Sequence, residues 1–232
     1  VSVSVTDAAG NTGRADGKVT VSSDKPTIRF NDIAEDNILN AVEKGQDLVI
    51  SGTSTHLAAG TTVTVTLNGK SYTATTAADG SWTLTLKPVD LAGLGEANYV
   101  LSATAANSIG NSVEATANLQ VDTALPYVII NAIASDDVIN KAEVEAGQNI
   151  TGRVINAAAG DTVTVIIAGK GYTAKVQPDL SWTVKVPSAD LTALGDGGLK
   201  VTASVTNGHG NTGGGERGFA IDANLPGLRI DT

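Results

Sequence analysis

The stretch that decides the fold reads Thr62-Val63-Thr64-Val65-Thr66-Leu67-Asn68-Gly69-Lys70-Ser71-Tyr72-Thr73-Ala74, and it continues after a short gap with Asp79-Gly80-Ser81-Trp82-Thr83-Leu84-Thr85-Leu86. Aliphatic residues alternate with threonine, which is the period of a β-strand with one face packed inward. Asn68-Gly69 and Asp79-Gly80 separate three such runs, and these dipeptides are strong signals of a tight hairpin. The pattern therefore predicts a three-stranded meander with Trp82 on its apolar face.

The same pattern returns 100 positions later, so that Trp182 matches Trp82 and Tyr172 matches Tyr72 without a gap. An internal period of this length decides the number of domains better than chain length does. We expect one preceding repeat, two complete repeats and one following repeat in this chain. Their predicted bounds are 1–25 for the C-terminal hairpin of the preceding repeat, 26–125 and 126–225 for the complete repeats, and 226–232 for the first strand of the following repeat.

Each complete repeat contains seven short runs with strand character, little helix and regular turn signals. This combination predicts an all-β fold of tandem seven-stranded immunoglobulin-like β-sandwiches. The connection between the repeats is short, and Pro126 restricts its own φ while it disfavours helix at Leu125. We therefore expect the sandwiches to be arranged as an elongated rod. Asp90 is expected to cap one helical turn beyond the meander.

Composition limits the possible functions of the chain. It contains no cysteine, which excludes disulfides, thiol catalysis and thiolate metal sites. No run approaches the roughly 18 apolar residues that a membrane-spanning helix needs, so we expect no membrane insertion. The net charge of −9 argues against nucleic-acid binding and favours hard cations as partners. The chain also contains no methionine, even at position 1, so we expect it to be a fragment of a longer protein.

Oxygen-bearing side chains recur where each predicted sandwich meets its linker. Tracing the strand directions places the long polar connection 31–46, the Asp90 corner and the exit at Asp122 at one pole. Calcium binds six to eight oxygens at loose geometry, so we predict a structural Ca²⁺ beside the linker. The candidate metal ligands are Asp36, Asn40, Glu43, Asp122, Asp136, Asp137, Asn140, Glu143 and Asp222.

The turns of the following repeat could add ligands, and these are Asp161, Asp179, Asn207 and Asn211. The alternative interpretation of all these side chains is structural, because Asp and Asn in long connections commonly form turns and caps.

Other chemistry-bearing residues favour plain structural roles. Trp82 and Trp182 have the parity of the apolar face, which favours a core position over a carbohydrate platform. His56 and His209 occupy unmatched turn positions and support neither a zinc pair nor a catalytic base. The glycine-rich segment 210–218 lacks the lysine of a phosphate-binding loop. No catalytic constellation recurs in both repeats, so we expect no enzyme.

Several motifs together resemble a known family, namely the bacterial immunoglobulin-like repeats of giant adhesins secreted by type I systems, such as the giant non-fimbrial adhesin of Salmonella. The motifs are Ile38-Leu39-Asn40-Ala41-Val42-Glu43, Asp79-Gly80-Ser81-Trp82-Thr83, Thr6-Asp7-Ala8-Ala9-Gly10-Asn11 and Val121-Asp122-Thr123-Ala124-Leu125-Pro126. The resemblance implies extracellular rods that hold a binding region away from the cell, with calcium stiffening many of the junctions. Ser22 stands where Asp122 and Asp222 stand, which makes the first junction the weakest candidate for calcium.

We therefore expect a structural spacer and stiffener of a large bacterial surface adhesin, secreted or cell-surface, with a role in cell adhesion and virulence. Its expected partners are the neighbouring repeats of the same chain, and a host-cell surface or glycan bound through parts outside this sequence. The chain itself is expected to be a monomer. The alternative is a carbohydrate- or protein-binding module, at an adhesin tip or attached to a secreted glycan-degrading enzyme. Strict repetition argues against that alternative, because a recognition site should make one repeat unlike the other.

Overall fold

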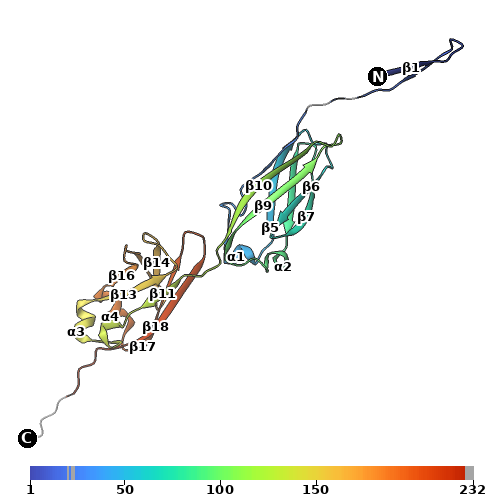
Figure 1. Ribbon diagram of the computed structural model, residues 1–232. Helices are drawn as coiled ribbons and strands as arrows, with labels where there is room; N and C mark the ends of the chain where they lie inside the picture. Colours follow the sequence, from blue (N-terminus) through green and yellow to red (C-terminus); the bar gives the residue numbers. More distant parts are fainter. Residues whose placement is uncertain (20, 22–23, 228–232) are drawn as a thin grey trace, which may run out of the picture. The chain divides into compact units, whose positions relative to one another are not determined.

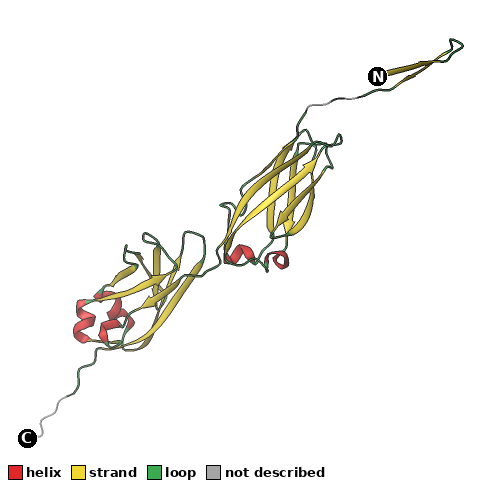
Figure 2. Ribbon diagram, in the orientation of Figure 1, coloured by secondary structure: helices red, strands yellow, loops and turns green. Residues whose placement is uncertain are grey.

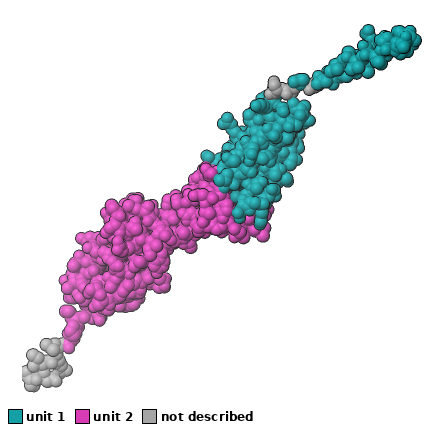
Figure 3. Space-filling model, in the orientation of Figure 1, with its two compact units in different colours: residues 1–32, 49–84, 100–117 teal, residues 33–48, 85–99, 118–232 magenta. Residues whose placement is uncertain are grey.

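The computed structural model describes residues 1–19, 21 and 24–227, and strands dominate it (Figures 1 and 2). By their internal contacts the residues form two compact units (Figure 3). The first unit contains residues 1–32, 49–84 and 100–117, and the second contains residues 33–48, 85–99 and 118–232. The boundary between the units crosses the first repeat. One end of that repeat, the linker and the whole second repeat therefore belong to a single unit.

The second repeat is a β-sandwich of two sheets. Its elements are β11 (Tyr127–Ile130), η1 (Ile133–Ser135), β12 (Val138–Asn140), α3 (Lys141–Ala146), β13 (Gln148–Ile155), β14 (Thr162–Ile167), β15 (Lys170–Lys175), β16 (Ser181–Val186), α4 (Ser188–Leu194), β17 (Gly197–Thr206) and β18 (Thr212–Asp222). One sheet has the order β12-β18-β17-β14-β15 and the other β11-β13-β16. Alternate residues of each strand point inward, and they bury a core of valine, isoleucine and leucine around Trp182, which is 0% exposed.

The first repeat has the same order of elements. They are β3 (Thr27–Phe30), β4 (Ile38–Leu39), α1 (Ala41–Lys44), β5 (Leu48–Thr55), β6 (Thr62–Leu67), β7 (Lys70–Thr75), β8 (Ser81–Leu86), α2 (Pro88–Leu91), β9 (Ala97–Ala106) and β10 (Ser112–Val121). The sheet orders β4-β10-β9-β6-β7 and β3-β5-β8 match those of the second repeat. Trp82 is 1% exposed, and Phe30 packs edge-on against its ring at 5.3 Å. The predicted core role of both tryptophans is confirmed.

The all-β sandwich prediction is confirmed, but the number of strands differs from seven. Residues 26–125 and 126–225 each contain eight strands, because a short strand in the polar connection pairs in parallel with the last strand. Ile38 lies opposite Gln120 in β10, and Val138 lies opposite Ala220 in β18. Strands of two or three residues are too short to show a period of two, so the sequence pattern missed them.

The predicted meander is wrong in its third strand. β6 and β7 form the expected hairpin, but β8 belongs to the sheet of β3 and β5. The Asp79-Gly80 turn therefore carries the chain from one sheet to the other. Gly80 O accepts the backbone N–H of Ser54 at 2.8 Å, which ties this turn to β5. Periodicity identifies the inward face of a strand and not its partner, so the pattern could not separate the two arrangements.

The second repeat replaces that glycine with Leu180, although the backbone keeps the same left-handed conformation. Gly80 has φ +82° and Leu180 has φ +65°. A left-handed backbone costs a residue with a Cβ about 1–2 kcal/mol. Leu180 therefore occupies a left-handed position that favours glycine, the residue that the first repeat has there.

Asp90 caps the helical turn from within its first turn and not from the N-cap position that we expected. Lys87 is the residue before α2, and Asp90 lies in the first turn, where its Oδ2 accepts the Lys87 N–H at 3.1 Å. In the second repeat Asp190 accepts hydrogen bonds from the Tyr172 hydroxyl at 2.9 Å and the Lys170 ammonium. Both aspartates thus fasten the corner by side-chain contacts rather than as the N-cap residue.

The N-terminal hairpin consists of β1 (Ser2–Thr6) and β2 (Thr12–Asp16), which pair in antiparallel register. β2 ends before Val19, so the second predicted strand of residues 1–25 is shorter than expected. Residues 20, 22 and 23 lie outside the described residues, and so does most of the segment 226–232 that we assigned to a following repeat. The domain bounds and the rod arrangement stay predictions.

Candidate functional site

Two of the candidate ligands form turns just before the short parallel strands. Asp36 Oδ1 accepts the Ile38 N–H at 2.9 Å, and Asp136 Oδ1 accepts the Val138 N–H at 3.0 Å. An aspartate that bonds the backbone two residues later is a common turn device. The repeated Asp therefore has a structural role in both repeats.

Four further candidates form two capping boxes. Asn40 Oδ1 accepts the Glu43 N–H at 3.0 Å, and Glu43 Oε2 accepts the Asn40 N–H at 3.0 Å. Asn140 and Glu143 repeat this arrangement at 3.1 and 2.9 Å at the start of α3. Reciprocal bonds of this kind satisfy the free N–H groups at the beginning of a helix. Because α1 and α3 span only 4 and 6 residues, these caps decide where the helices start.

Asp137 forms a bidentate ion pair with Arg217. Arg217 donates from Nε to Asp137 Oδ1 and from Nη2 to Oδ2, both at 2.6 Å, and Ile133 N–H donates to Oδ1 at 3.0 Å. The Arg217 hydrogen bonds, followed by the Ile133 bond, lower the pKa of Asp137 from 3.8 to about 2. Arg217 also donates to Ile130 O at 3.2 Å, so the pair links β18 to β11.

The ion pair predicts a pH-dependent stability in the second repeat only. A lowered carboxyl pKa means that the ionised form stabilises the fold above about pH 4 and that this contribution is lost as pH falls towards 2. We expect Asp137→Asn to lower the urea midpoint of the second repeat at pH 6 and to have little effect at pH 2. The substitution is conservative, because Asn37 accepts the Ile33 N–H at 3.0 Å in the first repeat. A difference that stays constant from pH 6 to pH 2 would contradict the assignment.

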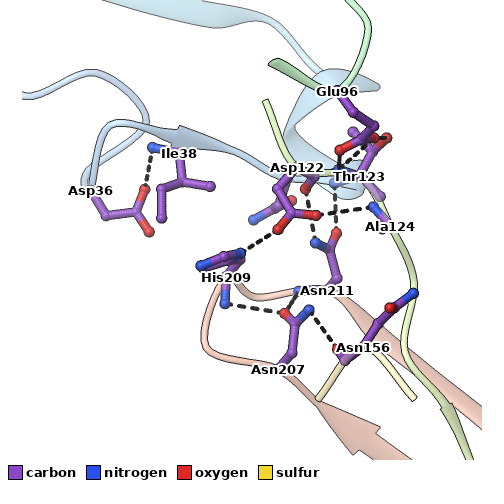
Figure 4. A network of polar contacts seen from close by, with 12 residues as sticks. Asp36, Ile38, Glu96, Asp122, Thr123, Ala124, Asn156, Asn207, His209 and Asn211 are labelled. Atoms are coloured by element: carbon purple, nitrogen blue, oxygen red, sulfur yellow. Dashed lines mark hydrogen bonds and ion pairs between the residues drawn. The ribbon is translucent and has the colours of Figure 1, made fainter. Parts of the chain in front are cut away.

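Asp122, where the chain leaves the first repeat, contacts the second repeat directly (Figure 4). Its Oδ2 contacts His209 Nδ1, and its Oδ1 accepts the Ala124 N–H at 3.2 Å. Its backbone oxygen accepts Asn211 Nδ2 at 2.8 Å. The His209 side chain is 39% exposed and lies against Asp122.

Asn211 is the most enclosed polar side chain of the junction, with an exposure of 0%. Its Oδ1 accepts the Ala41 N–H at 2.8 Å while its Nδ2 donates to Asp122 O. It therefore connects the beginning of α1 with the linker. Asn207 Oδ1 accepts the N–H groups of Asn211 and His209 at 3.0 and 3.1 Å, and these bonds hold the turn that presents both side chains.

The linker is held by a second acid that the sequence analysis did not single out. Glu96 Oε1 and Oε2 accept the Thr123 N–H at 2.9 and 3.1 Å. In the second repeat, Asp196 Oδ1 accepts the Ala223 N–H at 2.9 Å in the same way. The sequence signal for this contact is the acid that both repeats carry just before a strand, Glu96 before β9 and Asp196 before β17.

An open cleft of about 350 Å³ lies beside these contacts. Its lining consists of Asp122, Ala124, Asn156, Ala157, Ala158, Asn207, Gly208 and His209. Two of these residues are bonded to each other, because Asn207 Nδ2 donates to Asn156 O at 3.2 Å. The cleft therefore contains one carboxylate, one imidazole and several amide and carbonyl oxygens.

The candidate calcium ligands do not gather into one cluster. In Figure 4 Asp36 bonds Ile38 apart from the contacts around Asp122. Asp222 ends β18 opposite Asn140. Of the additional candidates, Asn207 and Asn211 do reach the junction. The other two form local turns, in which Asp161 Oδ2 accepts the Ala158 N–H at 2.8 Å and Asp179 Oδ1 accepts the Ser181 N–H. Among the residues that the structure describes, no group of three or more carboxylate or imidazole side chains could hold a metal ion. A calcium ion at the junction would rely on Asp122 together with amide, carbonyl and water oxygens.

The fold and this junction together define a class of protein, namely tandem immunoglobulin-like β-sandwich repeats. No family model matches the chain, and no curated protein matches it. Many solved structures do match it, and two of them illustrate the similarity. One is described as a Ca²⁺-stabilised adhesin that helps an Antarctic bacterium reach out and bind ice, with 32% identity, a TM-score of 0.62 and coverage of 97% of this chain and 57% of that chain. The other belongs to a study of host cell surface retention of a 1.5-MDa bacterial ice-binding adhesin, with 32% identity, a TM-score of 0.58 and coverage of 96% and 74%.

The chain therefore belongs to the immunoglobulin-like repeats of large bacterial adhesins. The matched structures support this repeat class and not the Salmonella adhesin in particular, which the motifs also resemble. The chain spans 57% of the first matched chain and 74% of the second. Within the part of the chain that the structure describes, no helix is long and apolar enough to cross a membrane.

Proposed function

We propose that the chain is a spacer in a large bacterial surface adhesin, where its repeats hold a binding region at a distance from the cell. The observation that carries this proposal is the buried Asn211, which bonds both α1 and the linker. A fully enclosed polar bridge requires its partners to stay in place, because an unsatisfied buried amide is costly. Such a bridge suits a chain whose repeats keep a fixed separation or transmit force. It does not suit a chain whose domains turn freely. The 32% identity to bacterial adhesins, one of them described in terms of host cell surface retention, supports an extracellular, non-enzymatic role with adjacent repeats as the immediate partners.

Small-angle X-ray scattering of the full chain tests the spacer role. We expect one extended particle, whose maximum dimension is the same at 0.1 and 1 M NaCl because salt hardly weakens the enclosed hydrogen bonds of Asn211. A broad distribution of compact and extended forms would contradict the role, since a hinge that moves freely cannot maintain a distance.

We further propose that calcium binds at the Asp122 junction and at its counterpart at Asp222. Support comes from the acidic linker exits, the oxygen-rich cleft beside Asp122 and the 32% identity to an adhesin described as Ca²⁺-stabilised. The remaining candidates would shape the loops around the ion or supply further oxygen ligands to it. They are the turn and cap residues from Asp36 to Glu43 and from Asp136 to Glu143. Calcium would supply positive charge between carboxylates at a loose, oxygen-only site.

Thermal unfolding with calcium and with a chelator tests this part of the proposal. At a calcium concentration tenfold above Kd we expect a stabilisation of about 1.4 kcal/mol, which Asp122→Asn should reduce. Glu114→Gln serves as the control, because it removes an exposed carboxylate that does not line the cleft. An identical melting temperature with calcium and chelator would refute the calcium site and leave the spacer role standing.

A further inference from the structure

One sheet face distinguishes the second repeat from the first. The outward residues of β11, β13 and β16 include Tyr127, Ile129 and Ile155, which are 55%, 39% and 49% exposed. Tyr127 lies directly opposite Ile155 in the antiparallel register, and Ile129 lies opposite Arg153. Side chains in such positions share a face and touch across the strands. The exposed apolar groups therefore form one continuous patch.

The first repeat has polar residues at the matching positions. Thr27 lies opposite Thr55, and Arg29 lies opposite Thr53, in the pairing of β3 with β5. Three apolar residues thus replace two threonines and an arginine on the same template. This contrast matters because the two repeats otherwise share their sheet order and core. Folding does not require the patch, since the first repeat forms the same sheets without it.

Two more apolar residues border the patch. Leu125 O accepts Asn156 Nδ2 at 3.3 Å, and Leu180 O accepts the Val154 N–H at 3.0 Å, so both residues lie at the end of β13. They are 54% and 38% exposed and replace Lys25 and Gly80. Leu180 is also the residue with the unfavourable left-handed backbone, at φ +65°. An exposed apolar side chain on a backbone that disfavours it points to a use other than stability.

The charged side chains that point outward from the three strands are both cations. The outward residues include the cations Arg153 and Lys185 and no carboxylate along the three strands, all of which the structure describes. Asp179 lies at the rim, where its carboxylate accepts the Ser181 N–H and hydroxyl and its backbone oxygen accepts Arg153 Nη2 at 2.7 Å. Arg153 is thus held in place from one side, and Lys185 has no carboxylate beside it along the three strands. Asn149, the partner of Lys185, lies four positions from Arg153 on β13, so the two cations are about 13 Å apart along the strand. In a chain of net charge −9, such a face is unusual and suits an acidic ligand.

The dimensions of the face favour a polymer chain over a protein partner. Three strands of about six residues cover roughly 300 Å², whereas a stable protein interface takes about 800 Å² from each side. A symmetric contact with a second copy would also bring Arg153 and Lys185 of both copies together. A flat strip with an aromatic ring, aliphatic groups and two spaced cations instead fits a sugar polymer that repeats a carboxylate along its length.

We propose that the outward face of β11, β13 and β16 binds an acidic polysaccharide built from uronic acids. The ring of Tyr127 and the side chains of Ile129 and Ile155 pack against the C–H faces of the sugars. Arg153 and Lys185 pair with carboxylates along the polymer. This binding is additional to the spacer role and independent of calcium at the junctions.

Binding of the full chain to polygalacturonate, measured by isothermal titration calorimetry, tests the proposal, with neutral dextran of similar size as the control polymer. We expect one site per chain, binding that weakens as salt rises, and no binding to dextran. The double variant Tyr127→Thr/Ile155→Thr and the double variant Arg153→Thr/Lys185→Thr should each weaken binding at least tenfold. These substitutions introduce the first repeat's own residues at 27, 55, 53 and 85, so an unchanged melting temperature is expected for the Tyr127→Thr/Ile155→Thr variant. Arg153→Thr also removes the bond from Nη2 to Asp179 O, so binding by that double variant is measured well below its own melting temperature.

The reciprocal experiment adds the face to the first repeat. Thr27→Tyr, Arg29→Ile, Thr53→Arg, Thr55→Ile and Thr85→Lys together should raise the stoichiometry from one site to two. Absence of binding by the native chain, or binding unchanged in both double variants, would overturn the proposal. Equal binding of poly-glutamate would overturn it in favour of an acidic protein surface. A concentration-dependent dimer that the Tyr127→Thr/Ile155→Thr variant abolishes would overturn it by identifying a second copy as the occupant.

Discussion

Gly152→Ala is expected to destabilise the second repeat by at least about 3 kcal/mol, which lowers its melting temperature by roughly 15 °C. A Cβ at Gly152 would lie 1.9 Å from Ile129 O and 2.6 Å from Trp182 Cζ2. Gly152 is the cross-strand partner of Trp182, and the indole ring covers the space where a side chain would stand. Neither a strand backbone nor a fully buried ring can move away by the required distance, roughly 1 Å, without disturbing the core.

The chain contains matched controls for this prediction. Gly52 has the same surroundings in the first repeat, where a Cβ would lie 1.9 Å from Arg29 O and 2.4 Å from Trp82 Cζ2, so Gly52→Ala should lower only the first repeat's transition. Gly171→Ser should be nearly neutral, because a Cβ there meets no atom within 4 Å and the first repeat has Ser71 at this position. Differential scanning calorimetry measures both transitions. A loss below about 1 kcal/mol for Gly152→Ala would mean that the tryptophan ring can be repacked.

Periodicity predicted the features of the fold that depend on which side of a strand is buried. The alternation around Trp82 and Trp182 correctly placed both rings in the core, since a buried residue reveals itself by the parity of its neighbours. It gave no information about which strand lies beside which, and so β8 was assigned to the wrong sheet. Partner choice depends on contacts between residues far apart in the chain, and no local pattern records these contacts. The parallel strands β4 and β12 were missed because they are too short to alternate.

The junction was predicted only in part for a similar reason. An acid in a connection can serve a turn, a cap or a ligand, and the sequence alone does not separate these roles. Asp36 and Glu43 proved to bond backbone N–H groups, whereas Asp122 reaches the next repeat. Asn211 could be named as a residue near the entry of the second repeat, but its enclosure depends on α1, which is 170 positions away in the chain. The apolar residues on the outward face of β11, β13 and β16, where β3, β5 and β8 have polar ones, can be read from the sequence only after the strands have been assigned to their sheets.

Asn211→Ala is expected to loosen the junction by about 2 kcal/mol while both sandwiches stay folded. The substitution leaves the Ala41 N–H and the Asp122 carbonyl without their partner in a buried position, and each unsatisfied group of this kind costs about 1–3 kcal/mol before any relaxation. The turn itself should persist, because Asn207 Oδ1 holds the backbone N–H of residue 211 and not its side chain. Hydrogen exchange at the Ala41 amide should therefore become about 30-fold faster, while core amides such as that of Val165 keep their protection.

Two further variants separate a bridge between the repeats from a purely local role of Asn211. Asn211→Asp keeps an acceptor for the Ala41 N–H but places a carboxylate against the Asp122 carbonyl, so the Ala41 amide should stay more protected than in Asn211→Ala. Asn111 is the matched residue of the first repeat, where its Nδ2 donates to Asp24 O at 3.3 Å from a half-buried position. Asn111→Ala should leave the Ala41 amide unchanged, because the bond of that side chain goes to Asp24 and not to α1. If Asn211→Ala slowed or preserved exchange at Ala41, the enclosed amide would not be what holds the linker to the helix, and the spacer role would lose its main support.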